Sequence, residues 1–571
     1  MHHQVSKSPE NSITIGGIKM IGKKKVALCI SLAALLPLTL IGSATAADTL
    51  DVVLYAPVDL KGVPALPFTG ESIKFTDPVS GVSALAVSTL QGPAGTSFSI
   101  SGSGLTPNTE LSLTWSTAKG AWKAQLLPNS VNYTGYQWDK FSVVLAKVTT
   151  DATGAFKLET KMPEDFGGPH DIYAVVNGLA VAKGAIQMTP SISITPKSGA
   201  IGTPITVTYK GMGPNLYTGG ISVLWDNSYA GEAQSLWTRG TSTFKIHAAG
   251  GLGSHLICGT AGIGVQYMNI NQSPVPYAGG DCATFVTTKD NGAKVASITY
   301  PQIVTPTQEQ RTLMNEPIDP ASKAVMTLSK DSGVVGEKIK IDVTGLTANT
   351  DYQITWASVV GNRVNCTTGT CWVYSGVPIS TVKSDASGVV ATEVAIPDHL
   401  GGAHAIQIKS GNLTQAQKSM FVKQSIFAYK SKAGKTLSMG VALAQKSRLP
   451  EDRNGSGTPT LKFKAGQEIT IAMKGVGWTQ LDNTMAVTYD NSYIGYGCGF
   501  NSNGYMVIHL RATGAVGTHI IDLHPVYYTN QPSFVNTQYG MLPILSYNTD
   551  FLGLALGYKQ PAVHFEIEIV K

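Results

Sequence analysis

Charged side chains are scarce in this sequence. Asp, Glu, Lys and Arg make up 14% of the 571 residues, against about 25% in ordinary soluble domains. The net charge is +6, of which residues 1–46 supply +4 through five Lys and one Glu, so the remainder is near +2. A nearly neutral chain has no electrostatic means of holding nucleic acid or an anionic membrane surface. We therefore expect no nucleic-acid partner.

Catalytic motifs are missing as well. The sequence has no Gly-x-Ser-x-Gly, no His-Glu-x-x-His and no Cys-x-x-Cys, so hydrolase, metalloprotease and thiol-redox signatures are absent. Asp452-x-Asn454-x-Ser456 starts like a calcium loop, but Phe463 stands where the bidentate Glu is required. His509, His519 and His524 share a region without a metal-site spacing. We expect no enzyme, no cofactor and no metal.

Long hydrophobic runs occur once, near the start of the chain. Lys23-Lys24-Lys25 precedes an apolar run from Val26 to Ile41, and Ala44-Thr45-Ala46 follows as a small-x-small step. This order is typical of a cleaved secretory signal peptide. A membrane anchor is the alternative, but the run is short for a span and contains Pro37. We expect export to the cell surface or the medium, with no transmembrane anchor after signal removal.

Cysteine use agrees with export, because disulfides persist in oxidising compartments. Five cysteines follow the signal segment. Cys366 with Cys371 would close a short loop, and Cys258 with Cys282 a longer one, so we expect these two disulfides. Cys498 remains, either as a buried free thiol or as one half of an intermolecular bridge.

Turn residues are abundant, and the sequence repeats itself. It holds 61 Gly and 29 Pro. Segment 105–115 (LTPNTELSLTW) matches 346–356 (LTANTDYQITW), which pairs a unit A with a later unit A′. Asp226–Tyr229 matches Asp490–Tyr493 without gaps, which pairs B with B′. The ungapped alignment extends to further segments: 210–213 with 474–477, and 253–255 with 517–519.

Each unit alternates apolar and polar residues between turns, as in Thr203–Tyr209, and no long stretch has a helical period. This pattern predicts an all-β chain of tandem immunoglobulin-like β-sandwiches in the order A-B-A′-B′. The expected organisation is a signal region 1–46, an extended segment 47–84, domain A 85–190, domain B 191–290, a linker 291–323, domain A′ 324–423, and domain B′ 424–571 with an extension.

The turn motifs carry a family resemblance. Ser198–Thr203, Thr344–Thr347 with Asn349-Thr350, and the Asp-Ala-Thr/Ser-Gly hairpins at 151–154 and 385–388 resemble bacterial and archaeal immunoglobulin-like repeats of exported surface proteins. The resemblance covers 80–560. It implies a sandwich fold and an adhesive, scaffolding or ligand-binding role, and it transfers no site residue.

One aromatic and one Gly-x-His histidine recur in each unit. Because they recur at equivalent places, we expect the aromatics to anchor the cores and the histidines to cap turns. His247 does not recur, since Arg511 is its counterpart. The recurring residues are Trp115, Trp225, Trp356 and Tyr489, with His170, His255, His404 and His519.

Other aromatics are candidates for a binding surface. Interfaces and sugar sites favour Tyr and Trp beside a few polar groups. The alternatives are edge cover for the insert of unit A and plain turn chemistry for the Asp-Asn-Ser-Tyr loops. The candidate binding residues are Trp122, Tyr133, Tyr136, Trp138, Asp226, Tyr229, Asp490, Tyr493, Tyr496 and Phe500.

Two functions fit this sequence. The first is a secreted or cell-surface, non-enzymatic protein that acts in adhesion, scaffolding or extracellular assembly, with other surface proteins or its own copies as partners. The alternative is an array of carbohydrate-binding modules that holds polysaccharide on the aromatic clusters. A hydrolase with an unrecognised carboxylate pair is a third class.

Overall fold

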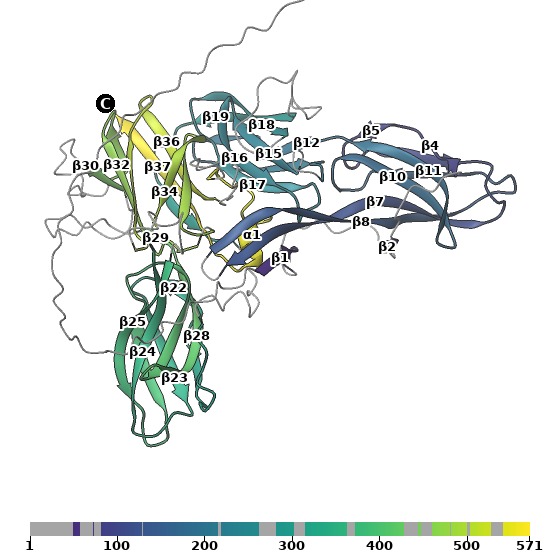
Figure 1. Ribbon diagram of the computed structural model, residues 1–571. Helices are drawn as coiled ribbons and strands as arrows, with labels where there is room; N and C mark the ends of the chain where they lie inside the picture. Colours follow the sequence, from purple (N-terminus) through teal and green to yellow (C-terminus); the bar gives the residue numbers. More distant parts are fainter. Residues whose placement is uncertain are drawn as a thin grey trace, which may run out of the picture. The chain divides into compact units, whose positions relative to one another are not determined.

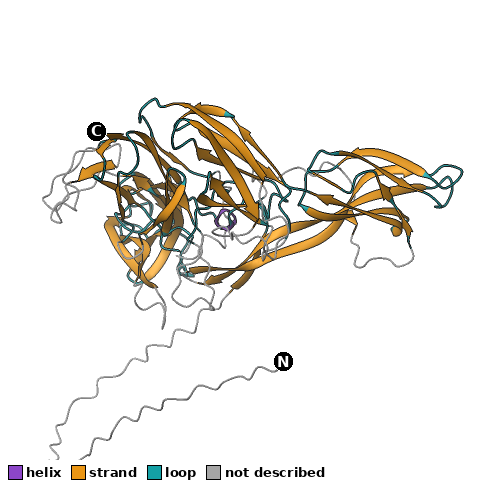
Figure 2. Cartoon of the chain, turned by 90° about the horizontal axis from the view of Figure 1, so that it is seen from above, coloured by secondary structure: helices purple, strands orange, loops and turns teal. Residues whose placement is uncertain are grey.

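The structure, a computed structural model, is built almost entirely from β-strands (Figure 2). It describes residues 50–57, 72–73, 82–127, 130–214, 219–261, 281–301, 315–361, 372–426, 443–446, 460–479, 481–499, 503–526 and 541–571. These all belong to the second of two compact units, Met1–Ala47 and Asp48–Lys571. The predicted signal segment, the Cys366–Cys371 pair and Phe500 lie outside the described residues. Across the described residues, no helix has the length and apolarity needed to cross a membrane.

Sandwich A pairs a three-stranded sheet with a larger one (Figure 1). The small sheet has the order β4-β6-β9, and the large sheet contains β8-β7-β10-β11, with the short strands β1, β2, β3 and β5 added at its edges. The strands are β1 (Leu50–Leu54), β2 (Ser72–Ile73), β3 (Ser83–Ala84), β4 (Ala86–Val87), β5 (Gln91–Gly92), β6 (Ser97–Gly102), β7 (Glu110–Leu127), β8 (Ser130–Thr149), β9 (Phe156–Lys161), β10 (Gly168–Val176) and β11 (Leu179–Met188).

Sandwich B has the small sheet β12-β14-β17 and the large sheet β13-β19-β18-β15-β16. Its core lies between them and includes Ile205, Trp225 and Phe285. The strands are β12 (Ser191–Thr195), β13 (Ser198–Ala200), β14 (Pro204–Lys210), β15 (Gly220–Trp225), β16 (Ser228–Gln234), β17 (Ser242–His247), β18 (Gly253–Ala261) and β19 (Asp281–Lys289).

Sandwich A′ has the same sheet orders, β21-β23-β26 and β22-β28-β27-β24-β25. Alternation explains its strands: along Lys338–Thr344, Ile339, Ile341 and Val343 are buried while their neighbours are exposed. The strands are β21 (Val325–Leu328), β22 (Ser332–Val334), β23 (Lys338–Thr344), β24 (Asp351–Gly361), β25 (Trp372–Lys383), β26 (Val390–Ala395), β27 (Gly402–Ser410) and β28 (Leu413–Lys423).

Sandwich B′ adds an extension to the pattern. Its large sheet is β20-β37-β36-β33-β34 with β31 beside β37, and its small sheet is built around β32. The only described helix, α1 (Leu552–Ala555), lies in the extension between β36 and β37. The strands are β20 (Ala296–Thr299), β29 (Ser425–Ile426), β30 (Leu443–Lys446), β31 (Lys462–Lys464), β32 (Glu468–Lys474), β33 (Thr484–Tyr489), β34 (Ser492–Cys498), β35 (Met506–Arg511), β36 (Gly517–Pro525) and β37 (Ala562–Val570).

All four sandwiches share one immunoglobulin-like feature. A short early strand pairs in parallel with the last strand: β5 with β11, β13 with β19, β22 with β28, and β31 with β37. The predicted all-β sandwich class is therefore the observed one. One stretch differs from the expectation, because Ala296–Thr299 lies inside the expected linker yet forms β20 and pairs with β37. Its alternating side chains complete the edge of the B′ sheet.

The contacts between A and B and between A′ and B′ use equivalent backbone hydrogen bonds. Gly167 donates its N–H to the carbonyl of Met212 over 2.8 Å, and Gly401 donates to Val476 over 2.9 Å. A Cβ on Gly167 would lie 1.8 Å from the Gly211 oxygen, and one on Gly401 1.7 Å from the Gly475 oxygen. Glycine is thus required where the two backbones meet.

Candidate functional site: the joints between sandwiches

The predicted aromatic cluster of unit A lies on the long β7–β8 hairpin, which extends beyond its sandwich to the region of α1 (Figure 1). Trp122 is 1% exposed. Its ring lies 5.4 Å from that of Tyr133 and 5.1 Å from that of Tyr136, and Tyr136 lies 5.3 Å from Trp138. The structure therefore brings all four residues together, as one packed ladder with half-buried outer rings.

A buried carboxylate from the B′ extension fixes this ladder. Trp122 donates its indole N–H to Asp550 Oδ1 over 2.8 Å, and Trp237 donates its backbone N–H to Asp550 Oδ2 over 2.8 Å. The Trp237 indole donates to the carbonyl of Leu54 over 2.9 Å. Asp550 is fully buried, and this burial raises its pKa to about 7. One carboxylate thus ties hairpin β7–β8 to sandwiches B and B′.

The surrounding apolar residues form a core shared by three sandwiches. Trp122 and Ala124 come from A, Leu236 and Trp237 from B, and Leu481, Phe551 and Tyr558 from B′. Tyr136 Oη donates to Gln234 Oε1 over 3.2 Å, and a Cβ on Gly120 would lie 2.4 Å from the Leu236 oxygen. Such close backbone approach and complete burial are the properties of a protein interior. We call this region the three-sandwich joint.

The recurring histidines lie against the recurring aromatics in every sandwich, stacked in A, B and A′ and tilted by 33° in B′. Ring centroids lie 4.3 Å apart for Trp115–His170, 4.9 Å for Trp225–His255, 4.8 Å for Trp356–His404 and 5.7 Å for Tyr489–His519. Both ring nitrogens of each histidine lie near an oxygen of a neighbouring loop or strand. The sequence-based expectation of a turn-capping role agrees with these contacts.

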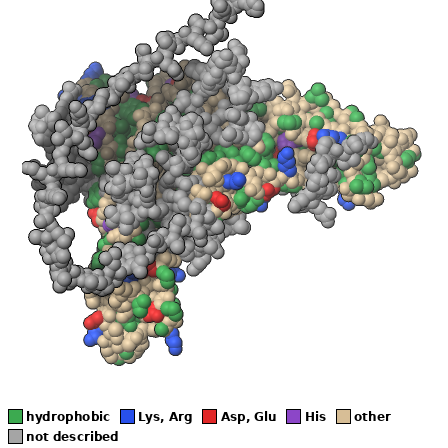
Figure 3. Space-filling view, in the orientation of Figure 1, with side chains coloured by type: hydrophobic (Ala, Val, Ile, Leu, Met, Phe, Trp, Pro, Cys, Tyr) green, Lys and Arg blue, Asp and Glu red, His purple; other side chains and the backbone are tan. Residues whose placement is uncertain are grey.

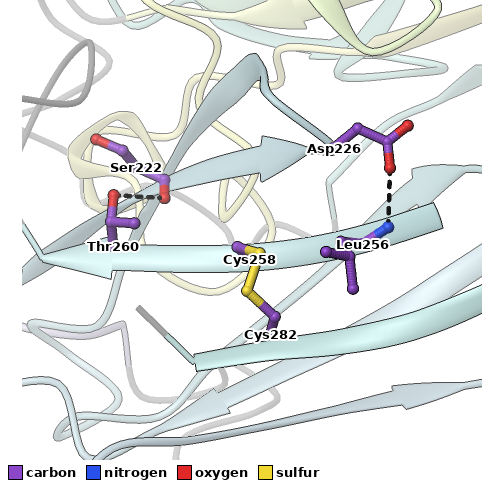
Figure 4. The surroundings of a disulfide bond; sticks show 6 residues. All are labelled: Ser222, Asp226, Leu256, Cys258, Thr260 and Cys282. Carbon is purple, nitrogen blue, oxygen red and sulfur yellow. Dashed lines mark hydrogen bonds between the residues drawn. A yellow bond between two sulfur atoms is a disulfide. The ribbon is translucent and has the colours of Figure 1, made fainter. Parts of the chain in front are cut away.

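The aspartates of the two Asp-Asn-Ser-Tyr loops contact the histidines of B and B′. We call each such aspartate–histidine contact a histidine clamp. Asp226 Oδ2 lies 2.9 Å from His255 Nδ1, and its Oδ1 accepts the Leu256 N–H over 2.9 Å (Figure 4). Asp490 contacts His519 Nδ1 over 2.6 Å and accepts the Ile520 N–H over 2.9 Å. The Asp490 carboxylate raises the pKa of His519 against the opposing effect of burial. Both candidate binding carboxylates thus have structural partners within their own sandwich.

The tyrosines of the same loops meet each other at the B–B′ contact. The rings of Tyr229 and Tyr493, which are equivalent residues of the repeat, lie 6.3 Å apart edge to face. Tyr493 Oη donates to the carbonyl of Met541 over 2.8 Å. Tyr496 is half-buried and pairs across the sheet with Ala486. The structure therefore does not place these rings in one flat exposed platform.

The Cys258–Cys282 disulfide is present as expected. It joins directly opposite residues of β18 and β19, with Cα atoms 4.1 Å apart (Figure 4). Cys498 is a half-buried free thiol.

The sequence patterns do not predict a further group of side chains that the structure brings together. His247 of β17 meets Asp522 of β36 and His564 of β37, and their ligand atoms all lie within 4.8 Å of one another. His564 Nδ1 lies 2.7 Å and His247 Nδ1 3.3 Å from Asp522 Oδ1. The two imidazoles hold the pKa of buried Asp522 well below its usual range, and Asp522 raises the pKa of His564 to about 9 against the effect of burial.

One cleft of about 410 Å³ lies where A meets B. Three charged side chains line it: Lys161, Glu164 and Lys210. Glu164 and Lys210 form an ion pair of 2.6 Å, and Thr241 donates to Glu164 over 2.9 Å. Where Figure 3 shows described residues, charged side chains of both signs are scattered among uncharged ones. Neither feature has the arrangement of an acid–base pair or a nucleophile.

Comparison with known proteins gives no relative by sequence: no protein-family model and no curated protein matches. Among solved structures, Salmonella alpha-2-macroglobulin reacted with methylamine is 8% identical over 84% of this chain, with a TM-score of 0.14. This chain spans 30% of that protein's length.

Two further solved structures are similar at the same level. A putative membrane anchored protein from Corynebacterium diphtheriae is 12% identical over 59% of this chain and 89% of its own, with a TM-score of 0.15. Spo0M, a sporulation control protein from Bacillus subtilis, is 11% identical over 36% of this chain and 78% of its own, with a TM-score of 0.13. These TM-scores are too low to establish a shared architecture.

Proposed function

We propose that this chain is an exported, non-enzymatic structural protein that works in extracellular assembly at the cell surface, with other surface proteins or further copies of itself as partners. The observation that carries this proposal is the three-sandwich joint. There the Asp550 carboxylate accepts hydrogen bonds from the Trp122 indole and the Trp237 backbone inside a shared core. Such a joint fixes the spacing of domains, which is what a scaffold requires.

Export is supported by two independent features. The Lys23–Lys25, Val26–Ile41 and Ala44–Ala46 sequence has the order of a secretory signal. The Cys258–Cys282 disulfide is of the kind that persists outside the reducing cytosol.

Exposed aliphatic side chains at equivalent places suggest where partners could bind. Leu252 of B and Val516 of B′ precede the same Gly-x-His step and are 64% and 61% exposed. Leu179 of A and Leu413 of A′ occupy equivalent hairpins and are 72% and 56% exposed. A single exposed Leu needs no explanation, but recurrence at matched positions favours a contact made by both halves of the chain.

The carbohydrate-binding alternative loses its main support. A sugar ring must contact an exposed aromatic face, whereas Trp122 is 1% exposed and donates to buried Asp550. Tyr229 and Tyr493 contact each other across the B–B′ boundary.

Cell fractionation and analytical ultracentrifugation test the proposal together. We expect the processed chain outside the cytoplasm, and we expect it to self-associate or to co-sediment with another surface protein. Leu252→Asp with Val516→Asp should reduce this association without lowering Tm, whereas Leu90→Asp, at another exposed position (75%), should not. A chain that stays in the cytoplasm, or one that remains monomeric without a surface partner, would contradict the proposal. A glycan array with robust binding would restore the alternative.

A further inference from the structure

The His247–Asp522–His564 group has the chemistry of a transition-metal site. Two imidazole nitrogens and one carboxylate oxygen form a common ligand set for Zn²⁺ with an open position. Zn–N and Zn–O bonds of about 2.0–2.2 Å put the ligand atoms of a tetrahedral site about 3.3–3.5 Å apart. The His247 Nδ1 to Asp522 Oδ1 distance is 3.3 Å, and all three ligand atoms lie within 4.8 Å of one another. The contact between His564 Nδ1 and Asp522 Oδ1 is 2.7 Å and would have to lengthen by about 0.6 Å to admit an ion.

The neighbours of these residues would hold them in orientation. Histidine ligands usually present their other ring nitrogen to a carboxylate or a carbonyl. Glu566 Oε1 lies 3.8 Å from His564 Nε2, and Glu566 Oε2 accepts the Lys294 N–H over 3.0 Å. Asn491 Nδ2 donates to the carbonyl of His247 over 2.8 Å. Glu566 thus lies beside the far ring nitrogen of His564, whereas Asn491 holds the backbone of His247.

A third histidine lies beside the group. His524 follows Asp522 by two residues on β36, so both point to the same face of the sheet. His524 is 8% exposed, and its buried Nδ1 has no hydrogen-bond partner among the described residues. Buried polar groups without partners are uncommon and costly. His524 interacts electrostatically with Asp522, His247 and His564, but it is not one of the residues whose ligand atoms lie within 4.8 Å of one another.

The internal repeat supplies an independent argument. The offset that aligns Asp226 with Asp490 also aligns Cys258 with Asp522. Cys258 is bonded to Cys282, directly opposite on the last strand of B, and Asp522 stands directly opposite His564 on the last strand of B′. B therefore has a covalent cross-strand link at the place where B′ carries two residues of the group, Asp522 and His564.

We propose that His247, Asp522 and His564 bind one divalent transition-metal ion of the Zn²⁺ class and so link sandwich B to sandwich B′. Nitrogen ligands select Zn²⁺ and its neighbours over Ca²⁺ and Mg²⁺, which prefer oxygen. His247 comes from B and the other two ligands from B′, so the ion would join segments 275 residues apart in sequence. This inference does not depend on the proposed assembly function.

Zn²⁺ binding to the metal-stripped full chain tests the site. All proteins compared carry His2→Ala and His3→Ala, so that these two adjacent histidines contribute no metal binding to the comparison. We expect one Zn²⁺ per chain in competition with a chromophoric chelator, and a higher Tm with Zn²⁺ because the ion binds the native state. His247→Ala and His564→Ala should abolish both effects, and Glu566→Gln should weaken binding by about 10-fold. His509→Ala, a histidine on β35 outside the group, should change neither.

Two results would overturn the proposal. One is the absence of stoichiometric Zn²⁺ binding by the unaltered site, and the other is binding that survives His247→Ala. Anomalous scattering from Zn²⁺-soaked crystals decides the matter even if a variant folds poorly. A metal peak bonded to His247, Asp522 and His564 supports the site, and a soaked crystal without a peak there refutes it.

Discussion

Sandwiches B and B′ connect the last two strands of their large sheets by different side-chain chemistry. In B, the last two strands of the large sheet are linked by the Cys258–Cys282 disulfide. In B′, the equivalent place holds Asp522 and His564, whose facing atoms lie 2.7 Å apart. The disulfide needs nothing further, and Cys282 is exposed. The carboxylate is buried and depends on His247 from the other sandwich.

This difference shows how a repeated domain can acquire dependence on its neighbour. A covalent link stabilises B alone, chiefly by restricting its unfolded chain. A buried Asp–His pair is stable only while both partners and their surroundings remain in place. Sandwich B′ also carries the extension with Asp550, which B lacks. The stability of B′ should therefore be coupled to A and B, whereas B, whose core takes Leu545 from that extension, also has a covalent link of its own.

The largest expected effect comes from Asp522→Ala. This change leaves the buried His564 imidazole and the half-buried His247 imidazole without their carboxylate, and breaking a buried pair in this way costs about 3–5 kcal/mol. Hydrogen exchange should show loss of protection in β36 and β37, and denaturant unfolding gives the free energy. Glu159→Ala is the matched control, since its ion pair with Lys157 is exposed and should change stability by less than about 0.5 kcal/mol. Equal effects of the two changes would remove the contrast between a buried and a surface carboxylate.

Asp550 should make the three-sandwich joint sensitive to pH. Its pKa is raised from 3.8 to about 7 by burial, so the folded chain retains a proton that the unfolded chain releases between these values. Stability is then greatest below about pH 4 for this group and falls as pH rises to 7, by up to about 4 kcal/mol on the linkage relation. Asp550→Asn, which stays neutral, should flatten this dependence. Hydrogen exchange of hairpin β7–β8, followed as a function of pH and corrected for the intrinsic exchange rate, measures this dependence of stability on pH. The same dependence in Asp550→Asn as in the unaltered chain would show that Asp550 is not its cause.

Removal of the disulfide tests the independence of B. The double change Cys258→Ala and Cys282→Ala opens a loop with a sequence separation of 24, for which the chain-entropy model gives about 3 kcal/mol. The loss should appear as faster exchange in β18 and β19 while β36 and β37 keep their protection. If B′ loses protection equally, the two sandwiches unfold as one unit and the proposed contrast fails.

Much of this architecture is predictable from sequence, because it depends on local patterns. Alternation such as that of Lys338–Thr344 predicts a strand with one buried and one exposed face, as in a β-sandwich. The four aromatics and their Gly-x-His histidines recur at equivalent places in the sequence. The Cys258–Cys282 disulfide is predictable for the same reason, since both cysteines lie in one domain.

The joints were not predictable, because they depend on contacts between distant segments. Trp122 and Asp550 are 428 residues apart, and neither residue type nor spacing indicates their pairing. Trp122 was therefore a candidate for sugar binding, although its ring is buried. The B–B′ alignment does place Asp522 at the position of Cys258, but the extension before β37 displaces His564 from any ungapped match. His247 has no counterpart in B′, so the repeat gives no sign of its role, yet it is one of the residues that distinguish the B–B′ contact.

The smallest expected effects come from the histidine clamps, where B and B′ use the same Asp–His contact in different surroundings. Asp490→Asn keeps an oxygen for the Ile520 N–H but removes the charge that faces His519, so we expect a loss of about 1 kcal/mol and a lower pKa of His519. Asp226→Asn should cost less, within about 0.5 kcal/mol, because the Asp226 side chain is 45% exposed and water screens the contact. Denaturant unfolding of the paired variants measures both costs, and NMR titration of the His519 ring measures the pKa. A larger loss for Asp226→Asn than for Asp490→Asn would show that burial does not set the strength of this clamp.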